Sequence, residues 1–261
     1  MKALAICILL LASLSATAED MRAYRRETQT LVQRGQYREA LERMVWFHHH
    51  ALEQDPTVYG TRLTTALDAW KRLASYYGPA KQALTRTRDR SEERLLERGG
   101  SRQIFNDLVA INRALGEAGK SLEIFQKLHD DHPQAALRYW NLIKDDVLVQ
   151  MDVDLADEYV TDPMIEFVKI KKSHERSAKL AANRPNSDPE ILRHHQELFV
   201  TKSRTLAGVA AKRDDSDTTV EIQQTALNQI DEPALRSIIT DGLPELPSSL
   251  PPAADPPAAV E

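Results

Sequence analysis

The sequence predicts an all-α protein. Only nine glycines occur in 261 residues, and the central part of the chain is rich in Ala, Leu, Glu, Arg and Gln, which favour helices. No run of alternating β-branched and polar residues is long enough to predict a strand. Glycine and proline divide the chain into intervals of about three to five helical turns, so we expect roughly a dozen helices.

The first eighteen residues have the three parts of a secretory signal peptide. A short positive region (residues 1–2) precedes an apolar run (residues 3–14), and an Ala-Thr-Ala cleavage site follows at residues 16–18. The apolar run is shorter than the roughly 18 to 20 residues of a membrane-spanning helix. We therefore expect cleavage after Ala18, a periplasmic or secreted protein, and no stable membrane anchor.

Loss of this segment changes the charge and the cysteine content. Cys7 is the only cysteine, so disulfides cannot hold the mature chain. The full chain has 34 Lys and Arg and 39 Asp and Glu, and removal of Lys2 leaves a net charge of −6. A mildly acidic chain without a basic block argues against nucleic acid or an anionic membrane surface as the main partner.

Residues 19–163 read as pairs of antiparallel helices. The breakers between them are Gly35, Asp55-Pro56, Gly78-Pro79, Gly99-Gly100, Gly116 with Gly119, Pro133 and Asp162-Pro163. The stretch 105–133 shows the pattern best, with buried positions on two helices, a glycine turn and a closing proline. These positions are Phe105, Leu108, Val109, Gly116, Ser121, Phe125, Leu128 and Pro133.

Units of this kind start at Leu67, Arg102 and Ala136, which are 35 and 34 residues apart. A further unit lies at the N-terminus, where the turn and second helix fit better than the first helix. The in-phase positions outside the stretch 105–133 are Gly35, Tyr37, Ala40 and Met44; Trp70, Leu73, Ala74 and Tyr77; and Tyr139, Leu142, Leu155 and Tyr159.

This pattern resembles the tetratricopeptide-repeat family in the exported bacterial type with degenerate repeats. Asn112 departs from it, because a tyrosine or leucine is usual there. The resemblance implies a short α-α solenoid over residues 19–163, and a non-repeating helical bundle is the alternative.

The C-terminal part carries no consensus positions. We expect helices at residues 164–182, 190–212, 220–230 and 232–240, which form a C-terminal helical region over residues 164–242. The second of these helices has an apolar side and is expected to pack back on the solenoid or to cap it. The prolines and alanines of residues 243–261 predict a disordered tail. Such a tail could serve as a tether or solubilising segment, or as a Pro-rich ligand for a partner's groove.

The resemblance also implies a concave groove. In the family, positions on the first helix of each unit hold extended peptides. Carried over in register, they are Asp68, Lys71 and Ser75; Asn106, Ala110 and Arg113; and Trp140 and Lys144. Their cationic and amide groups would hold carboxylates or backbone carbonyls, with the tryptophan as an apolar anchor. The alternative is that they are ordinary solvated helix residues.

One stretch fits the loose pattern of a phosphate-binding loop. It runs from Ala114 to Ser121 and contains Gly116, Gly119 and Lys120. Such a loop needs a buried strand before it, whereas residues 105–113 have helical periodicity. We therefore assign the two glycines to a turn between helices.

The histidines do not predict a metal site. Three consecutive rings at residues 48–50 point about 100° apart on a helix and cannot converge on one ion. His129 and His132 have a better spacing but are ordinary polar residues near a helix end. Weaker patterns are His174-Glu175 and the set Glu190, His194 and His195.

The sequence thus predicts a non-catalytic exported scaffold that binds a protein or peptide through a concave helical groove, without a cofactor. The competing class is a helical enzyme, or a small-ligand or metal binder, with a C-terminal pocket lined by His194, Glu197 and Arg204. A structural homo-oligomer is a third possibility.

Overall fold

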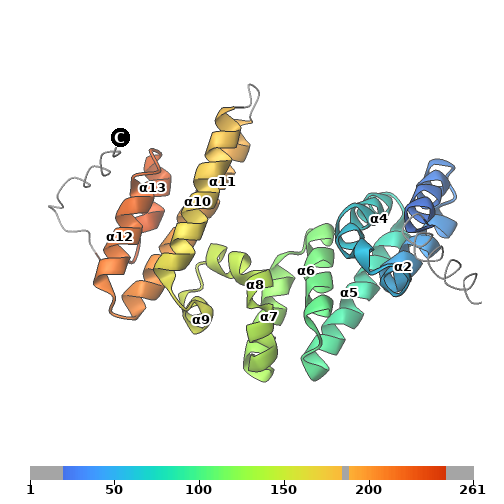
Figure 1. The fold of residues 1–261 in the computed structure, drawn as a ribbon, viewed down its shortest axis with the longest axis horizontal. Helices are drawn as coiled ribbons and strands as arrows, with labels where there is room; N and C mark the ends of the chain where they lie inside the picture. Colours follow the sequence, from blue (N-terminus) through green and yellow to red (C-terminus); the bar gives the residue numbers. More distant parts are fainter. Residues whose placement is uncertain (1–19, 184–187, 245–261) are drawn as a thin grey trace, which may run out of the picture. The chain divides into compact units, whose positions relative to one another are not determined.

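The computed structural model describes residues 20–183 and 188–244. All regular secondary structure in these ranges is helical, which confirms the all-α prediction (Figure 1). The predicted signal peptide at residues 1–18, and residues 245–261 of the predicted tail, lie outside the described ranges. Within those ranges, no helix has the length and apolar character that a membrane crossing requires.

The first compact unit ends at Ile143. It begins with an N-terminal helix, described over residues 20–33. It continues with α2 (Tyr37–Gln54), a 3-10 turn η1 (Pro56–Val58), α3 (Tyr59–Thr61), a π-helical turn η2 (Arg62–Ala66), α4 (Leu67–Ala74), α5 (Gly78–Arg98), α6 (Arg102–Leu115), α7 (Gly119–Asp131) and the first part of α8 (Pro133–Val149). Neighbours in the chain pack on one another: α4 on α5, α5 on α6 and α7, and α6 on α7.

The predicted breakers set the helix limits. Gly35, Gly99 and Gly116 have φ angles of 75°, 71° and 76°, which residues with a side chain rarely adopt. Pro79 stands in the first turn of α5, where its missing N–H costs nothing. Local backbone chemistry therefore decides where these helices begin and end.

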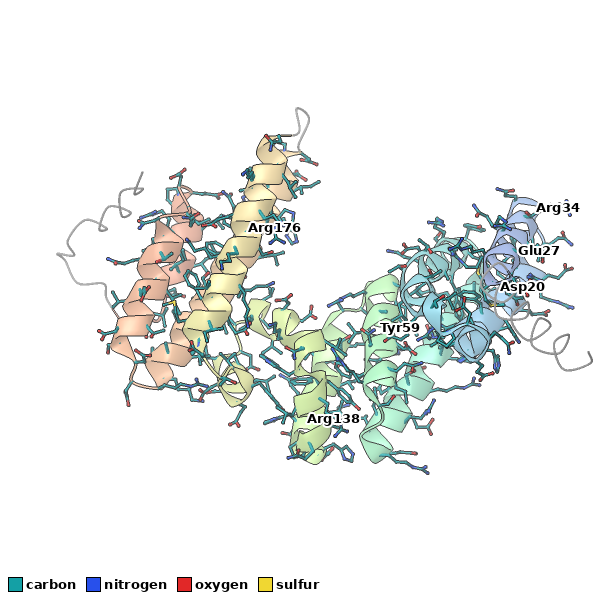
Figure 2. The ribbon with its side chains drawn as sticks, in the orientation of Figure 1. Asp20, Glu27, Arg34, Tyr59, Arg138 and Arg176 are labelled. Carbon is teal, nitrogen blue, oxygen red and sulfur yellow. The ribbon has the colours of Figure 1, made fainter. Side chains whose placement is uncertain are left out.

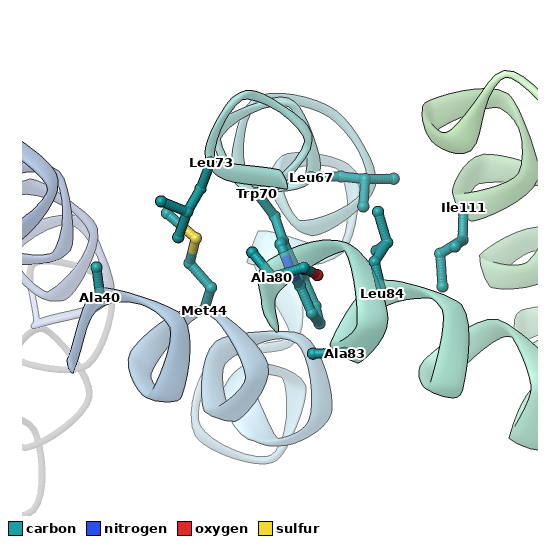
Figure 3. Packing of buried hydrophobic residues seen from close by; sticks show 9 residues of the cluster. All are labelled: Ala40, Met44, Leu67, Trp70, Leu73, Ala80, Ala83, Leu84 and Ile111. Atoms are coloured by element: carbon teal, nitrogen blue, oxygen red, sulfur yellow. The ribbon is translucent and has the colours of Figure 1, made fainter. Parts of the chain in front are cut away.

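The core of the first unit is built from the apolar positions that the sequence assigned to inner faces. Trp70 and Leu73 are fully buried, and the Trp70 indole N–H donates to the Ala80 carbonyl at 3.0 Å. Phe105 stacks on Tyr139 with ring centroids 4.8 Å apart. Figure 3 shows the cluster of Ala40, Met44, Leu67, Trp70, Leu73, Ala80, Ala83, Leu84 and Ile111.

The second compact unit begins at Lys144. Its helices, after the end of α8, are α9 (Val153–Tyr159), α10 (Pro163–Ala182), α11 (Pro189–Lys212), α12 (Ser216–Leu227) and α13 (Pro233–Thr240). Helix α11 packs on each of the other four. It is thus the central helix of its own unit. The prediction that this helix packs back on the repeats or caps them remains a prediction.

Two boundaries differ from the prediction. Helix α12 begins at Ser216 instead of residue 220, because the Asp215 carboxylate accepts a hydrogen bond from the Thr218 N–H at 3.0 Å and caps the helix. The predicted repeat region runs to residue 163, whereas the compact units divide inside α8. The physical reason is that α9 packs on α11 and so belongs to the second unit.

Candidate functional site

A groove of about 590 Å³ lies in the first unit between the N-terminal helix, α2, η2 and α4. Its volume is in the range of ligand-binding pockets. The floor is made of buried apolar side chains, namely Met44, Phe47, Leu67 and Trp70. Around them stand more exposed arginines, namely Arg22, Arg25, Arg26 and Arg72. We call this site the N-terminal groove.

The helical period places the rim on one side of the N-terminal helix. Arg22, Arg25, Arg26 and Gln29 are spaced by three, four and seven residues, which puts them on one face. The opposite wall comes from η2 and α4. A π-helical turn holds more residues than an α-turn and is frequent at functional sites, and here it begins at Arg62.

The groove carries strong positive charge. Six arginines line it, and among the described residues no Asp or Glu does. Arg43 pairs with Glu27 at 2.9 Å, and its guanidinium lies 3.8 Å from the centre of the Tyr24 ring. Glu27 is labelled on the N-terminal helix in Figure 2.

Four of the arginines have no carboxylate partner within the described part of the chain. These are the rim residues Arg22, Arg25, Arg26 and Arg72; of these, Arg25 donates to the Thr65 hydroxyl at 2.7 Å. Local excess of one charge in an apolar-walled cavity concentrates ligands of the opposite charge. The groove is therefore suited to an anionic ligand, although the whole chain is acidic.

Below the rim lies a buried polar cluster. The Arg62 guanidinium is 2% exposed, and its Nη1 donates to the His48 carbonyl at 3.2 Å and to Asp107 Oδ2 at 3.0 Å. Its Nη2 donates to the other carboxylate oxygen. Burial, together with the adjacent Arg62 charge, lowers the pKa of His48 to about 3. The imidazole is therefore neutral, and its Nε2 lies 3.3 Å from Arg62 Nη1.

None of the six residues predicted to form the concave groove lines the N-terminal groove. Lys71 and Ser75 are exposed, and the Ser75 hydroxyl donates to the Arg72 carbonyl at 2.8 Å. Asn106 donates to the Tyr59 hydroxyl at 2.7 Å; Figure 2 labels Tyr59. The amide of Asn106 therefore already holds a partner within the protein.

The structure places the other predicted groove residues on several different elements. Trp140 is only 8% exposed, and its ring lies 6.2 Å from that of Phe125, so its indole is part of the core and not an open anchor. Arg113 is exposed on α6, whereas Lys144 belongs to the second unit and pairs with Glu166 at 2.8 Å. The repeat resemblance also implied two further groove positions. Of these, Asp68 is exposed and Ala110 packs against the core.

The phosphate-loop pattern forms a turn between helices. The residues before it form α6, so the strand that such a loop needs is missing at this position. Gly116 ends α6, and Lys120 pairs with Glu117 at 2.9 Å. Ser121 is buried and accepts a hydrogen bond from Asn112 at 3.0 Å.

Over residues 20–183 and 188–244, no group of three or more His, Cys, Asp or Glu side chains is placed to hold a metal ion. His132 Nε2 lies 2.8 Å from the Leu96 carbonyl oxygen. This contact gives the ring a structural role between α5 and the junction of α7 with α8.

The second unit has a smaller pocket of about 230 Å³ between α8, α10 and α11. Its lining includes Lys144, Glu166 and His174, whose ring stacks on Phe199 with centroids 4.2 Å apart. The three residues predicted for a C-terminal pocket do not line it. Glu197 instead pairs with Arg193 at 3.1 Å, Arg204 donates to the Asp241 carbonyl at 3.1 Å, and His194 is exposed.

One part of the N-terminal groove had a signal in the sequence. Arginines at positions 22, 25 and 26, followed by glutamines at 29 and 33, mark one basic and polar helix face. No sequence signal pointed to Arg62, because its place in the groove depends on a π-helical turn and on the Asp107 carboxylate, 45 residues away.

Comparison of the chain with models of protein families, with curated proteins and with solved structures gives no match. The function is therefore inferred from the geometry and charge of the groove.

Proposed function

We propose that this protein is a non-catalytic, exported interaction scaffold whose N-terminal groove binds an acidic segment of a partner protein. The observation that carries the proposal has three parts, each true of the residues that the structure describes. Four arginines of the lining have no carboxylate partner, the floor is apolar, and no Asp or Glu lines the groove. Export rests on the predicted signal peptide. The proposal places binding in the N-terminal groove, whose lining includes none of the six residues that the repeat resemblance implied.

The rim arginines supply recognition of carboxylates. A guanidinium presents several N–H donors in a plane and binds a carboxylate through two parallel hydrogen bonds. Arg22, Arg26 and Arg72 are exposed, so their guanidinium groups can contact a ligand without any rearrangement of the core. They also make association fast and dependent on salt.

The floor supplies an anchor for an apolar side chain. Phe47 and Trp70 line a cavity large enough for a ring and are themselves 3% and 1% exposed. The area removed from water on binding is therefore mainly that of the ligand's own apolar side chain, at about 25 cal/mol per Å². An acidic segment with one aromatic or aliphatic residue between its carboxylates thus matches both the floor and the rim.

The side chains of the lining favour binding over catalysis. Thr28 donates to the Tyr24 carbonyl at 2.8 Å and accepts from Arg43 at 3.1 Å, while Thr65 accepts from Arg25. The neutral His48 imidazole is bonded to Arg62. The Thr28 and Thr65 hydroxyls are therefore not paired, within the described residues, with a general base that could activate them.

Binding of a synthetic peptide tests the proposal. The probe is fluorescein-labelled Gly-Asp-Glu-Phe-Glu-Asp-amide, and its Kd is measured by fluorescence polarisation at 50 and 300 mM salt. A triple variant, Arg22→Gln, Arg26→Gln and Arg72→Gln, should bind at least tenfold more weakly, which corresponds to about 1.4 kcal/mol. Affinity of the unmodified protein should fall with salt.

The matched control removes the same charge elsewhere in the first unit. Arg34, Arg86 and Arg94 are exposed and do not line the groove. A triple change of these residues to Gln should keep the Kd within about twofold. Equal weakening by both triple variants would show that only general charge attracts the peptide, and the N-terminal groove would then not be the binding site.

A further inference from the structure

The Arg62 guanidinium has one N–H group without a partner. Nη1 and Nη2 are used by His48 and Asp107, but the buried Nε has no hydrogen-bond acceptor within the described residues. A buried donor without an acceptor costs about 1–3 kcal/mol, so native proteins rarely keep one. Arg62 lines the N-terminal groove, and an acceptor can therefore come from what the groove holds.

Charge decides what kind of acceptor fits at Arg62. The Asp107 carboxylate binds the guanidinium through both oxygens and neutralises it. A second carboxylate at Nε would meet a neutral pair and would be repelled by Asp107 in a site of low dielectric. A neutral carbonyl oxygen needs only the unused N–H.

The rim of the groove, in contrast to the site at Arg62, favours a negatively charged group. Arg22, Arg26 and Arg72 have no carboxylate partner within the described ranges and so prefer anionic groups. One occupant must therefore present a neutral carbonyl at depth, carboxylates at the rim, and an apolar group over Phe47 and Trp70. A fatty acid has no carbonyl along its chain, and a polyphosphate has no apolar part.

We infer that the occupant of the N-terminal groove is an extended peptide whose main-chain carbonyl accepts a hydrogen bond from Arg62 Nε, while acidic side chains on either side bind the rim arginines. The inference rests on the proposed function and adds main-chain recognition to it. An extended chain offers a carbonyl at every residue, about 3.4 Å apart, and its side chains alternate in direction. A main-chain carbonyl can then reach Arg62 while acidic side chains of the same peptide reach the rim arginines.

Substitution of Arg62 would break a buried ion pair, so the test changes the ligand. Each peptide bond around the Phe of the probe is replaced in turn by a thioamide, a weaker and larger acceptor. One position should lose roughly fivefold in affinity, and the others should change little. In ¹H–¹⁵N spectra of the arginine side chains, the Arg62 Nε–H signal should shift with the unmodified peptide and less with that thioamide.

Dodecanoate, an anionic amphiphile without an internal carbonyl, is the comparison ligand. It should compete with the labelled peptide at least tenfold less well than unlabelled peptide. If the peptide binds but no thioamide matters and the Arg62 Nε–H signal does not move, the inference is wrong while the proposed function stands. Equal competition by dodecanoate would also overturn it. If the acidic peptide does not bind at all, both proposals fall.

Discussion

Arg62 and Asp107, 45 residues apart in the chain, form a buried ion pair that joins η2 to α6. Their side chains are 2% and 13% exposed, and both Nη atoms of the guanidinium bond to the carboxylate. This contact joins the base of the N-terminal groove to helix α6 of the first unit.

Removing one member of this pair should destabilise the first unit strongly. Arg62→Met or Asp107→Leu leaves a buried charge without its partner, at a cost of about 3–5 kcal/mol in the free energy of unfolding. The double variant should lose much less than the sum. Urea unfolding followed by tryptophan fluorescence measures this, because Trp46, Trp70 and Trp140 are the chain's only tryptophans and all lie in the first unit.

A surface pair serves as the control for that cycle. Arg38 and Glu42 form an exposed ion pair one helical turn apart, and its removal should cost less than about 1 kcal/mol. Strict additivity of the Arg62 and Asp107 substitutions would contradict a direct coupling between the two residues.

His48 should make the stability of the first unit depend on pH. Its pKa is about 3 in the folded protein and about 6.5 when unfolded, so the unfolded chain binds more protons between these values. The contribution of His48 to the free energy of unfolding is therefore fully present above pH 6.5. Below that value it falls by about 1.4 kcal/mol per pH unit. Urea titrations of the wild-type protein and His48→Gln at pH 7.5 and 5 compare the two slopes.

His48→Gln should lose about 2 kcal/mol less than the wild-type protein between those pH values. The shifted pKa of His49 is present in both proteins and cancels in the comparison. His50→Gln, at an exposed position, is the control. It removes the His50 charge that helps to lower the pKa of His49, but it leaves His48 in place, so its slope should stay closer to that of the wild-type protein than the slope of His48→Gln does. Parallel pH profiles for His48→Gln and the wild-type protein would rule out a buried, neutral His48.

Asn112 occupies the position where the repeat resemblance expects leucine or tyrosine. It is fully buried; its amide donates to the Ser121 hydroxyl at 3.0 Å, and its carbonyl oxygen lies 3.4 Å from Arg88 Nη1. Asn112→Leu should destabilise the first unit by about 1–3 kcal/mol, because Ser121 and Arg88 lose a buried partner. Adding Ser121→Ala should recover part of this loss, and tryptophan-detected unfolding in urea measures both. A single variant as stable as the wild-type protein would contradict this role for the amide.

Gly208 permits the close approach of α11 to α9. A Cβ on this residue would lie 2.8 Å from Val153 Cγ2. Gly208→Ala should therefore destabilise the second unit by about 1–3 kcal/mol, although Gly→Ala in an open helix normally stabilises. Thermal unfolding followed by circular dichroism measures the change.

The clash can be relieved from the other side. The double variant Gly208→Ala and Val153→Ala should regain stability relative to the Val153→Ala protein, because the added methyl group then has space. Gly60→Ala is the control, since a Cβ there has no neighbour within 4 Å. A stabilising effect of Gly208→Ala alone would contradict the close packing of α9 and α11.

The sequence by itself determined the all-α class and most helix limits. Glycines with positive φ, prolines in first turns and the helical period act within a few residues, so they can be recognised without the fold. The same reasoning found the inner positions Trp70, Phe105 and Leu108, all of which are buried. The repeat family and the exported location remain predictions.

Only the tertiary structure decided which polar residues meet. The burial of Trp140 against Phe125, the place of α9 beside α11, and the pairing of Arg62 with Asp107 all join residues that are distant in the chain. Helical period tells which residues share a face, but it does not tell which neighbour covers that face. For that physical reason the sequence did not predict the N-terminal groove, which four segments form by packing together and which arginines line. The peptide groove of the repeat resemblance remains a prediction.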